Sequence, residues 1–523
     1  MTRNLRVGDL VARNAARTPH APAVIDGTSS TSWHQLDQAA NRLASGLLGL
    51  GLRRGDRVAT VMRNGTPAVE MLFAVAKAGF VGVPINHGLT VSEVEFLLRD
   101  SDPHAIVIDD EFADTLADLI RGRPLRVVVI GDRLRRAEPD WISYDDLKKR
   151  GSSGIDDSQV SPDDLRTIRY TSGTTAAPKG CMGTHRQILA SIANFFEEIP
   201  VPADGPFLQL LPLFSGAGIW MSVAAAYQGV PTIVQPAFEP AEALKAAEYA
   251  KARHTWAVPT IVGRLTEEYA TGGYDLSSLE LFGYGGSPMP PRVIRRALET
   301  LPCRFYQGFG GGELGGLVAY LQPDEHARAR SDARSAERLR SVGRPAKYAE
   351  IRILDRRDGQ QVEQGELGEI VVRSPSNFSG YWNRPEETAE TLRGEWVHTG
   401  DMGYFDKDGF LYVVDRAKDM VLTGGMNVSS AEVEAVLMDH PDVAGAAVIG
   451  VPDEEWGEAV TAVVILRDGA TTSEADLLQY ARSRLAGYKT PKSVKFVDSF
   501  PMNSAGKILK RELRERFGGP PRR

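Results

Sequence analysis

The sequence predicts an α/β protein, with a large N-terminal domain of mixed and parallel sheets flanked by helices. Two observations support this class. Short β-branched runs alternate with stretches of helical periodicity such as 33–50 and 241–252. This alternation is typical of parallel sheets covered by helices. The β-branched runs lie at 58–62, 105–108, 127–130, 232–234 and 279–282.

The pattern of predicted strands and helices changes after residue 350, and this change predicts a subdomain and a further domain. Runs at 369–373 and 409–414 indicate strands separated by turns, and therefore a β-rich subdomain. Beyond Asp415, strand and helix segments alternate over about a hundred residues, enough for a small α+β C-terminal domain. We place the major boundary at 416–418. The segments of the small domain lie at 431–438, 444–451, 459–466, 474–485 and 493–497.

Length and composition exclude several classes of protein. A chain of 523 residues is too long for one compact core, and its 42% hydrophobic and 25% charged residues are ordinary for a globular protein. The net charge of −7 argues against a nucleic-acid partner. The most apolar stretch, 71–85, contains Lys77 and Pro84 and predicts a buried helix passing into a strand, so no membrane span is expected.

The two cysteines, Cys181 and Cys303, fit a reducing compartment. The N-terminus lacks the apolar core of a secretory signal, so we expect a cytoplasmic protein. A catalytic thiol at Cys181 is conceivable, but a small buried residue is favoured because no paired histidine motif accompanies it.

One run, YTSGTTAAPKG at 170–180, predicts a site for polyphosphate. Phosphate oxygens are bound by hydroxyls and by free backbone N–H groups of a glycine loop, and a lysine adds a point charge. Gly180 follows the lysine, so the run is not a Walker loop. By itself it could also be a polar surface turn. The candidate phosphate-binding residues are Thr171, Ser172, Gly173, Thr174, Thr175 and Lys179.

Five further segments follow in order at 282–288, 306–313, 398–401, 415–428 and 501–508. Each has an ordinary interpretation when taken alone. The glycines of the first would let backbone approach a flat ligand, but they could also end a strand. The aspartate of the third is a common turn residue, and the charged cluster of the fourth is usually a solvated face.

Together, these six segments resemble the motifs of the adenylate-forming superfamily, which comprises acyl-CoA synthetases, luciferases and the adenylation domains of peptide synthetases. The likeness is strongest to acyl-CoA ligases. It implies the cofactors ATP, Mg²⁺ and coenzyme A, and a carboxylic acid as substrate. It also implies an adenylation domain at 1–415, a hinge at 416–418 and a mobile C-terminal domain at 419–523. A homodimer is left open.

The resemblance also implies a role for each matching residue. Lys507 is the adenylation lysine, Glu313 binds Mg²⁺ and Lys179 contacts phosphate. Lys418 is the hinge position, while Asp401 accepts hydrogen bonds from ribose and Arg416 contacts ribose or phosphate. The remaining nucleotide-binding residues are Gly285, Gly286, Ser287, Gly308, Phe309, Gly310 and Gly312, and the coenzyme A tunnel is expected at Gly424 and Gly425.

The implied reaction has two steps. A carboxylate attacks the α-phosphate of ATP and expels pyrophosphate, and the thiol of coenzyme A then attacks the acyl carbon and releases AMP. The acid is already ionised at neutral pH and needs no general base, so charge neutralisation must dominate catalysis. Between the steps the small domain rotates about its hinge and withdraws Lys507.

Three residues depart from the family pattern. Ala176 replaces a glycine, Ser215 stands where acyl-CoA synthetases generally have histidine, and Gly312 replaces a threonine. One hypothesis is an enlarged acyl pocket at Ser215 and the 310–312 run, including Gly311, suited to a bulky acid. Harmless drift is an equally weighted alternative. A neutral Ser215 argues against amino-acid substrates.

Other functions stay open on the sequence alone. The first is a stand-alone adenylating enzyme, or one that performs a single half-reaction and passes acyl-AMP to a partner. The second is a degenerate nucleotide-binding protein, which the retained Lys179, Glu313, Asp401, Arg416 and Lys507 disfavour. The third is a luciferase-like oxygenase, which nothing in the chain specifically indicates.

Overall fold

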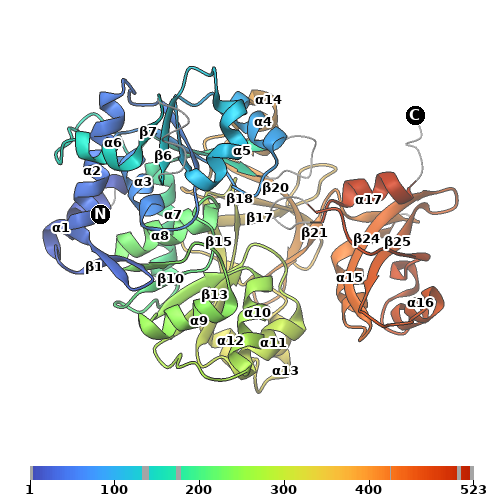
Figure 1. Ribbon diagram of the computed structural model, residues 1–523. Helices are drawn as coiled ribbons and strands as arrows, with labels where there is room; N and C mark the ends of the chain where they lie inside the picture. The colour runs from blue at the N-terminus through green and yellow to red at the C-terminus, as the bar shows by residue number, and fades with distance from the viewer. Residues whose placement is uncertain (1–3, 132–139, 172–177, 425, 503–507, 519–523) are drawn as a thin grey trace. The chain divides into compact units, whose positions relative to one another are not determined.

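The computed structural model describes residues 4–131, 140–171, 178–424, 426–502 and 508–518 (Figure 1). Two compact units can be distinguished by their internal contacts. The described residues of the large unit are 4–131, 140–171, 178–350 and 372–397, and those of the small unit are 351–371, 398–424, 426–502 and 508–518.

The large unit contains a nine-stranded sheet in the order β16-β15-β14-β13-β12-β10-β11-β1-β2. Its interior pairs are parallel, whereas β1 with β2, β14 with β15 and β15 with β16 are antiparallel. The strands are β1 (Pro22–Asp26), β2 (Ser29–Ser32), β10 (Phe207–Gln209), β11 (Thr232–Val234), β12 (His254–Ala257), β13 (Leu281–Gly285), β14 (Arg304–Gly311), β15 (Gly316–Leu321) and β16 (Arg344–Pro345).

A seven-stranded sheet in the same unit has the order β7-β6-β5-β3-β4-β8-β9. It is parallel except for the antiparallel hairpin of β8 and β9 at one edge. Its strands are β3 (Arg57–Val61), β4 (Val81–Pro84), β5 (Ala105–Asp109), β6 (Arg126–Ile130), β7 (Ile142–Ser143), β8 (Leu165–Thr171) and β9 (Lys179–Thr184).

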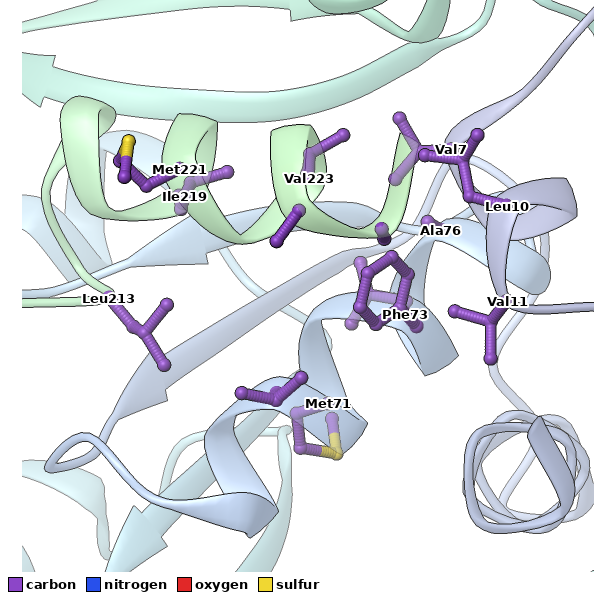
Figure 2. Packing of buried hydrophobic residues seen from close by; sticks show 14 of the residues in the cluster. Val7, Leu10, Val11, Met71, Phe73, Ala76, Leu213, Ile219, Met221 and Val223 are labelled. Carbon is purple, nitrogen blue, oxygen red and sulfur yellow. The ribbon is translucent and has the colours of Figure 1, made fainter. Parts of the chain in front are cut away.

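Three helices of the large unit pack their apolar side chains into one core, shown in close-up in Figure 2. They are α1 (Val7–Arg17), α3 (Thr66–Lys77) and α8 (Gly216–Gln228). Phe73 on α3 is buried there among residues of α1 and α8. The other helices of the unit are α2 (Trp33–Gly49), α4 (Val91–Ser101), α5 (Asp110–Ile120), α6 (Tyr144–Arg150), α7 (His185–Glu198), α9 (Pro240–Tyr249), α10 (Pro259–Ala270), α11 (Pro291–Thr300), α12 (Pro323–Arg328), α13 (Ala333–Arg338) and α14 (Pro385–Thr391).

The small unit begins with the β-rich part of the chain, where β20 (Trp396–Phe405) pairs antiparallel with β21 (Leu411–Arg416). The other strands from this part of the sequence are β17 (Glu350–Leu354) and β18 (Gly368–Arg373), together with β19 (Leu392–Arg393), which belongs to the large unit. A separate sheet follows in the order β23-β22-β25-β24, with β26 beside β25. Its elements are β22 (Val421–Thr423), β23 (Met426–Val428), α15 (Ser430–Met438), β24 (Val443–Asp453), β25 (Gly457–Leu466), α16 (Glu474–Arg482), β26 (Ser493–Phe496) and α17 (Lys510–Phe517).

The predicted α/β fold class is confirmed, as are the predicted strands and helices within a few residues at their ends. The apolar stretch at 71–85 is the end of α3 followed by β4, both within the core. Among the described residues, no helix is both long and apolar enough to cross a membrane.

Candidate active site

The phosphate motif joins the two strands of the β8–β9 hairpin. Thr171 and Lys179 are paired at its end, where the Thr171 hydroxyl lies 3.5 Å from the Lys179 carbonyl. Ser172, Gly173, Thr174, Thr175 and Ala176 lie outside the described residues, so their predicted contacts with phosphate stay predictions. The hairpin therefore holds Thr171 directly before this segment and Lys179 directly after it.

Tyr381 links the two charged residues predicted for this site. Its hydroxyl donates a hydrogen bond to Glu313 Oε1 at 2.8 Å, and the Nζ atom of Lys179 lies 5.0 Å from the centroid of its ring. At this distance, cation–π attraction stabilises the ammonium group in its position above the face of the ring. Lys179 and Glu313 are far apart in sequence, but both contact Tyr381. Lys179 lies over the face of its ring, and Glu313 accepts a hydrogen bond from its hydroxyl.

Backbone pairing with β9 places Tyr381. Cys181 and Tyr381 form an antiparallel bridge, Met182 N donates to the Gly380 carbonyl at 2.9 Å, and Trp382 N donates to the Gly180 carbonyl at 2.8 Å. Burial, together with the Glu313 carboxylate, raises the pKa of Tyr381 above its ordinary value. The phenol therefore remains a protonated donor to Glu313 at neutral pH.

The surroundings of Glu313 fit the predicted Mg²⁺ ion. Mg²⁺ prefers oxygen ligands and usually takes one or two carboxylates together with water and nucleotide phosphates. Glu313 supplies one such carboxylate, and it lies near Lys179 and the β8–β9 hairpin that flanks the predicted phosphate-binding segment. Among the described residues there is no cluster of three His, Cys, Asp or Glu side chains that could hold a metal alone. These residues thus fit an ion that arrives with a nucleotide.

The predicted adenine loops lie at the carboxyl ends of two interior strands of the nine-stranded sheet, β13 and β14. Strands β13 and β14 are parallel, with Gly285 paired to Gly308, so the residues that follow them emerge on the same side. A Cβ atom on Gly285 would lie 2.2 Å from the Gly308 carbonyl oxygen, which explains why glycine is needed there. Gly286 has a φ of 82°, Ser287 is exposed, and Phe309 is half-buried. The fold thus brings these segments together, as a nucleotide site requires.

Ser215 caps helix α8. Its Oγ accepts a hydrogen bond from Gly218 N at 3.0 Å and donates one to the Pro212 carbonyl at 2.7 Å. Serine is a preferred N-cap residue because its oxygen satisfies a free N–H of the first turn. The hydroxyl is therefore engaged with backbone, and replacement of the family histidine here has a local structural reason.

The surroundings of the 310–312 glycines differ from one glycine to the next. A Cβ atom on Gly310 would lie 1.8 Å from the Gly316 carbonyl oxygen. On Gly312 it would lie 2.8 Å from Thr171 Cγ2 and 3.3 Å from the sulfur of Cys181. Only Gly311 faces open space, with Glu313 Oε2 as its nearest neighbour at 3.8 Å. Backbone and neighbouring side chains therefore lie where a side chain at Gly310 or Gly312 would begin, and the enlarged acyl pocket stays a prediction.

Cys181 is fully buried, as favoured from the sequence. Burial raises the pKa of its thiol well above the ordinary value, so the thiol stays protonated at neutral pH. Its structural contribution is to occupy volume next to Gly312. This excludes the alternative of an activated nucleophile at this position.

The contact at Gly312 gives a direct prediction. Gly312→Ala should lower the melting temperature and the rate of pyrophosphate release, because overpacking of this kind typically costs about 1–3 kcal/mol. Thr171→Ser removes the methyl group that the new Cβ would meet and keeps the hydroxyl. We therefore expect the double variant to recover much of both losses.

Gly311→Ala is the matched control for stability, since its Cβ would enter open space. Its melting temperature should stay within about 1 °C of wild type, as is usual for substitutions without a new contact. Equal losses in the single and double Gly312 variants would show that Thr171 does not set the packing here.

Two residues of this site were not found from the sequence. Tyr381 comes from a distant segment, and no feature of its local sequence indicates a contact with Glu313. Arg169 lies on β8, and its Nη2 is 3.4 Å from the Gly312 carbonyl. Burial lowers the pKa of Arg169, while Cys181 and Glu313 oppose this shift. An arginine inside a strand that precedes a phosphate motif was the available signal.

In the small unit, Asp401 and Arg416 are neighbours across the β20–β21 pair. Arg416 Nε lies 2.7 Å from Asp401 Oδ1, and Arg416 Nη1 donates to the Thr399 carbonyl at 3.1 Å. Arg416 is half exposed, whereas the Asp401 side chain is mostly covered. The ion pair orients both side chains that were predicted to contact the ribose.

The predicted hinge and tunnel residues lie farther along the small unit. Lys418 is in a turn, where Arg514 Nη2 donates to its carbonyl at 3.3 Å. Gly424 has a φ of 55° and donates its N–H to the Trp456 carbonyl at 2.7 Å. Gly425 and Lys507 lie outside the described residues, and Met502 and Ile508 on either side of the lysine motif form an antiparallel bridge.

Comparison with protein families decides the kind of protein. The AMP-binding enzyme family matches residues 11–382, and the AMP-binding enzyme C-terminal domain matches residues 432–507. The chain belongs to the AMP-binding enzyme family. The predicted membership of the adenylate-forming superfamily, close to acyl-CoA ligases, is thereby confirmed.

Individual relatives of this AMP-binding enzyme extend over its whole length. A feruloyl-CoA synthase from Amycolatopsis sp is 38% identical, covering 99% of this chain and 100% of the relative. The amide bond synthetase McbA from Marinactinospora thermotolerans has a TM-score of 0.86 at 31% identity, covering 98% of this chain and 100% of its own. The anthranilate CoA ligase AuaEII, in complex with anthranoyl-AMP, has a TM-score of 0.87 at 26% identity. The match covers 99% of this chain and 98% of that ligase.

Proposed function

We propose that this enzyme activates an aromatic carboxylic acid with ATP and transfers the acyl group to coenzyme A. The observation that carries the proposal is the Lys179–Tyr381–Glu313 contact at the end of the phosphate hairpin. It supports the proposal, because a cation and a carboxylate that contact the same tyrosine suit a nucleotide polyphosphate and its Mg²⁺ ion. The aromatic class is supported by the similarity to feruloyl-CoA synthase and anthranilate CoA ligase.

In the first step an oxygen of the acid attacks the α-phosphorus of ATP. The bond from that phosphorus to the bridging oxygen breaks, and pyrophosphate leaves with the electron pair. Both reactants are anions, so the groups that neutralise charge lower the barrier. Lys179 and the hydroxyl of Thr171 would bind phosphate oxygens, and Lys507 would lie between the carboxylate and the α-phosphate. Bound Mg²⁺ supplies further neutralisation at Glu313.

We expect the nucleoside to be bound by the residues that match the family motifs. Backbone at Gly285, Gly286, Ser287 and Gly308 would approach the adenine, and the half-buried Phe309 would stack on it. Asp401, oriented by Arg416, would accept hydrogen bonds from the ribose hydroxyls. In the second step the thiol attacks the acyl carbon, AMP leaves and the thiol proton passes to solvent. The loop at Gly424 and Gly425 would border the pantetheine chain.

We also propose that 416–418 forms the hinge between an adenylation domain at 1–415 and a mobile domain at 419–523. Asp415 supports this placement, because it is a buried anchor directly before the hinge. Its Oδ2 accepts hydrogen bonds from Ser430 N and Oγ, both at 2.6 Å. Lys418 lies just beyond this anchor, where backbone rotation would move everything that follows.

A panel of acids with ATP and coenzyme A tests the substrate class. Pyrophosphate and thioester are measured separately for ferulate, benzoate, hexanoate and acetate. We expect kcat/KM for pyrophosphate release to be at least about tenfold higher for ferulate than for acetate, since each methylene-sized difference in pocket contact contributes roughly 1–3 kcal/mol. A preference for acetate would contradict the aromatic class.

The second candidate is transfer of the activated acyl group to an amine or to another protein. The similarity to the amide bond synthetase McbA favours keeping this candidate. The same panel separates the two by mass spectrometry. Acyl-CoA formed in step with pyrophosphate supports the thioester, whereas acyl-AMP that accumulates in the presence of coenzyme A supports transfer to a different acceptor.

A further inference from the structure

A cavity of about 60 Å³ lies in the large unit between α3, the strands β3, β4 and β8, and the segment that leads into α8. Its walls are mostly apolar, and include Met71, Leu72, Val75, Leu213 and Ile219. Figure 2 shows Met71 on α3, with Leu213 and Ile219 on the segment around the start of α8. Lys179, Glu313 and Tyr381 do not border this cavity, and neither do Ser215 and Gly311.

Arg166 on β8 also borders the cavity, and it is an unusual residue for such a place. Its side chain is only 4% exposed. Among the described residues, the Nε atom of its guanidinium is buried and has no hydrogen-bond partner. Burial lowers the pKa of Arg166 to about 9, so the group is still a cation at neutral pH.

The charged and titratable groups that interact with Arg166 do not neutralise its charge. Arg169 on the same strand is a second cation, and its charge also disfavours the protonated form of Arg166. His185 at the start of α7 is fully buried, and burial together with Arg166 and Arg6 lowers its pKa to about 3, so it stays neutral. An unpaired charge in an apolar interior costs several kcal/mol unless it is neutralised by a partner.

The size and chemistry of the cavity limit what this partner can be. A cavity of about 60 Å³ holds roughly four to six water-sized groups, at about 10–15 Å³ for each. The fork of an arginine matches a carboxylate with two parallel hydrogen bonds. The apolar walls favour an aliphatic body and disfavour a fully hydrated inorganic anion such as phosphate.

We propose that this cavity is a binding site for a short-chain aliphatic carboxylate of about two to four carbons, with its carboxylate on Arg166 and its chain against Met71, Val75 and Leu213. The site is separate from the adenylation site and binds its ligand without reacting with it. This inference goes beyond the proposed function, and only the competition with an adenylate analogue rests on that function.

Titration calorimetry with butyrate tests the proposal. The full-length enzyme is titrated with and without a saturating sulfamoyl analogue of feruloyl-adenylate, which occupies the adenylation site. We expect one butyrate site to remain in the presence of the analogue. Arg166→Met should weaken butyrate binding at least tenfold, because it removes the cation and keeps a similar apolar volume. Arg295→Met, an exposed arginine on α11, is the matched control and should bind as wild type does.

Butyramide keeps the test decisive even if Arg166→Met does not fold. It has nearly the shape of butyrate without the charge, so it should bind wild type at least tenfold more weakly. Equal binding of the two compounds would overturn the proposal. So would wild-type affinity in Arg166→Met, displacement of butyrate by the adenylate analogue, or the absence of butyrate binding to the wild-type enzyme.

Discussion

Lys507→Ala should abolish most acid-dependent pyrophosphate release while leaving transfer from a supplied acyl-adenylate to coenzyme A largely intact. The first step joins two anions, and the lysine cation would offset their repulsion only in that step. Removing one such group typically lowers the rate about 10²–10³-fold. In the second step the phosphate ester is a leaving group, and the predicted domain rotation has withdrawn the lysine.

The two half-reactions are measured separately, as pyrophosphate released from ATP and acid and as thioester formed from synthetic acyl-adenylate. Lys495→Ala is the control, because Lys495 is an exposed lysine of the same unit on β26. Wild-type pyrophosphate release in Lys507→Ala would refute the role given to the lysine. An equal loss in both half-reactions would instead indicate a general effect on the small unit.

Glu313→Gln should have the second largest effect, about a 10²–10³-fold loss of pyrophosphate release at a fixed Mg²⁺ concentration. The amide keeps the shape of the carboxylate and can still accept a hydrogen bond from Tyr381, but it carries no charge for Mg²⁺. We therefore expect the variant to need a higher Mg²⁺ concentration for half-maximal rate. A Mg²⁺ titration at saturating ATP measures this shift.

Two further variants make that result specific. Glu390→Gln changes an exposed glutamate of α14 in the same unit and should behave as wild type. Tyr381→Phe removes the 2.8 Å hydrogen bond to Glu313 and keeps the ring beneath Lys179. Its loss should be smaller and should not exceed roughly 10- to 150-fold, because a hydrogen bond to a charged group contributes roughly 1.5–3 kcal/mol and about 1.4 kcal/mol corresponds to a tenfold change. If Glu313→Gln leaves the Mg²⁺ dependence unchanged, the carboxylate does not bind the ion.

Regular elements of this fold could be predicted because local patterns determine them. The β-branched run at 127–130 becomes β6, and the apolar stretch at 71–85 becomes the end of α3 followed by β4. Gly285 lies where two backbones approach closely, as expected for a glycine, and its assignment to a ligand loop stays a prediction.

Contacts between distant segments could not be predicted in this way. Tyr381 reaches Glu313 only because its segment pairs with β9, and no local pattern specifies that pairing. The role of Ser215 as a helix cap depends on the conformation of the following turn. The space next to Gly312 seemed open in sequence, but Thr171 and Cys181 fill it from another sheet. Nothing in the sequence around Arg166 indicates that its side chain is buried with an unpartnered Nε atom, which only the three-dimensional structure shows.

The oxygen atom that joins acid and nucleotide provides the most direct test of the adenylation chemistry. Ferulate labelled with ¹⁸O in its carboxylate is incubated with ATP, Mg²⁺ and coenzyme A, and the products are analysed by mass spectrometry. Attack on the α-phosphorus followed by thiol attack on the acyl carbon must leave one labelled oxygen in AMP and none in pyrophosphate. Label in inorganic phosphate with formation of ADP, or unlabelled AMP, would contradict an acyl-adenylate intermediate.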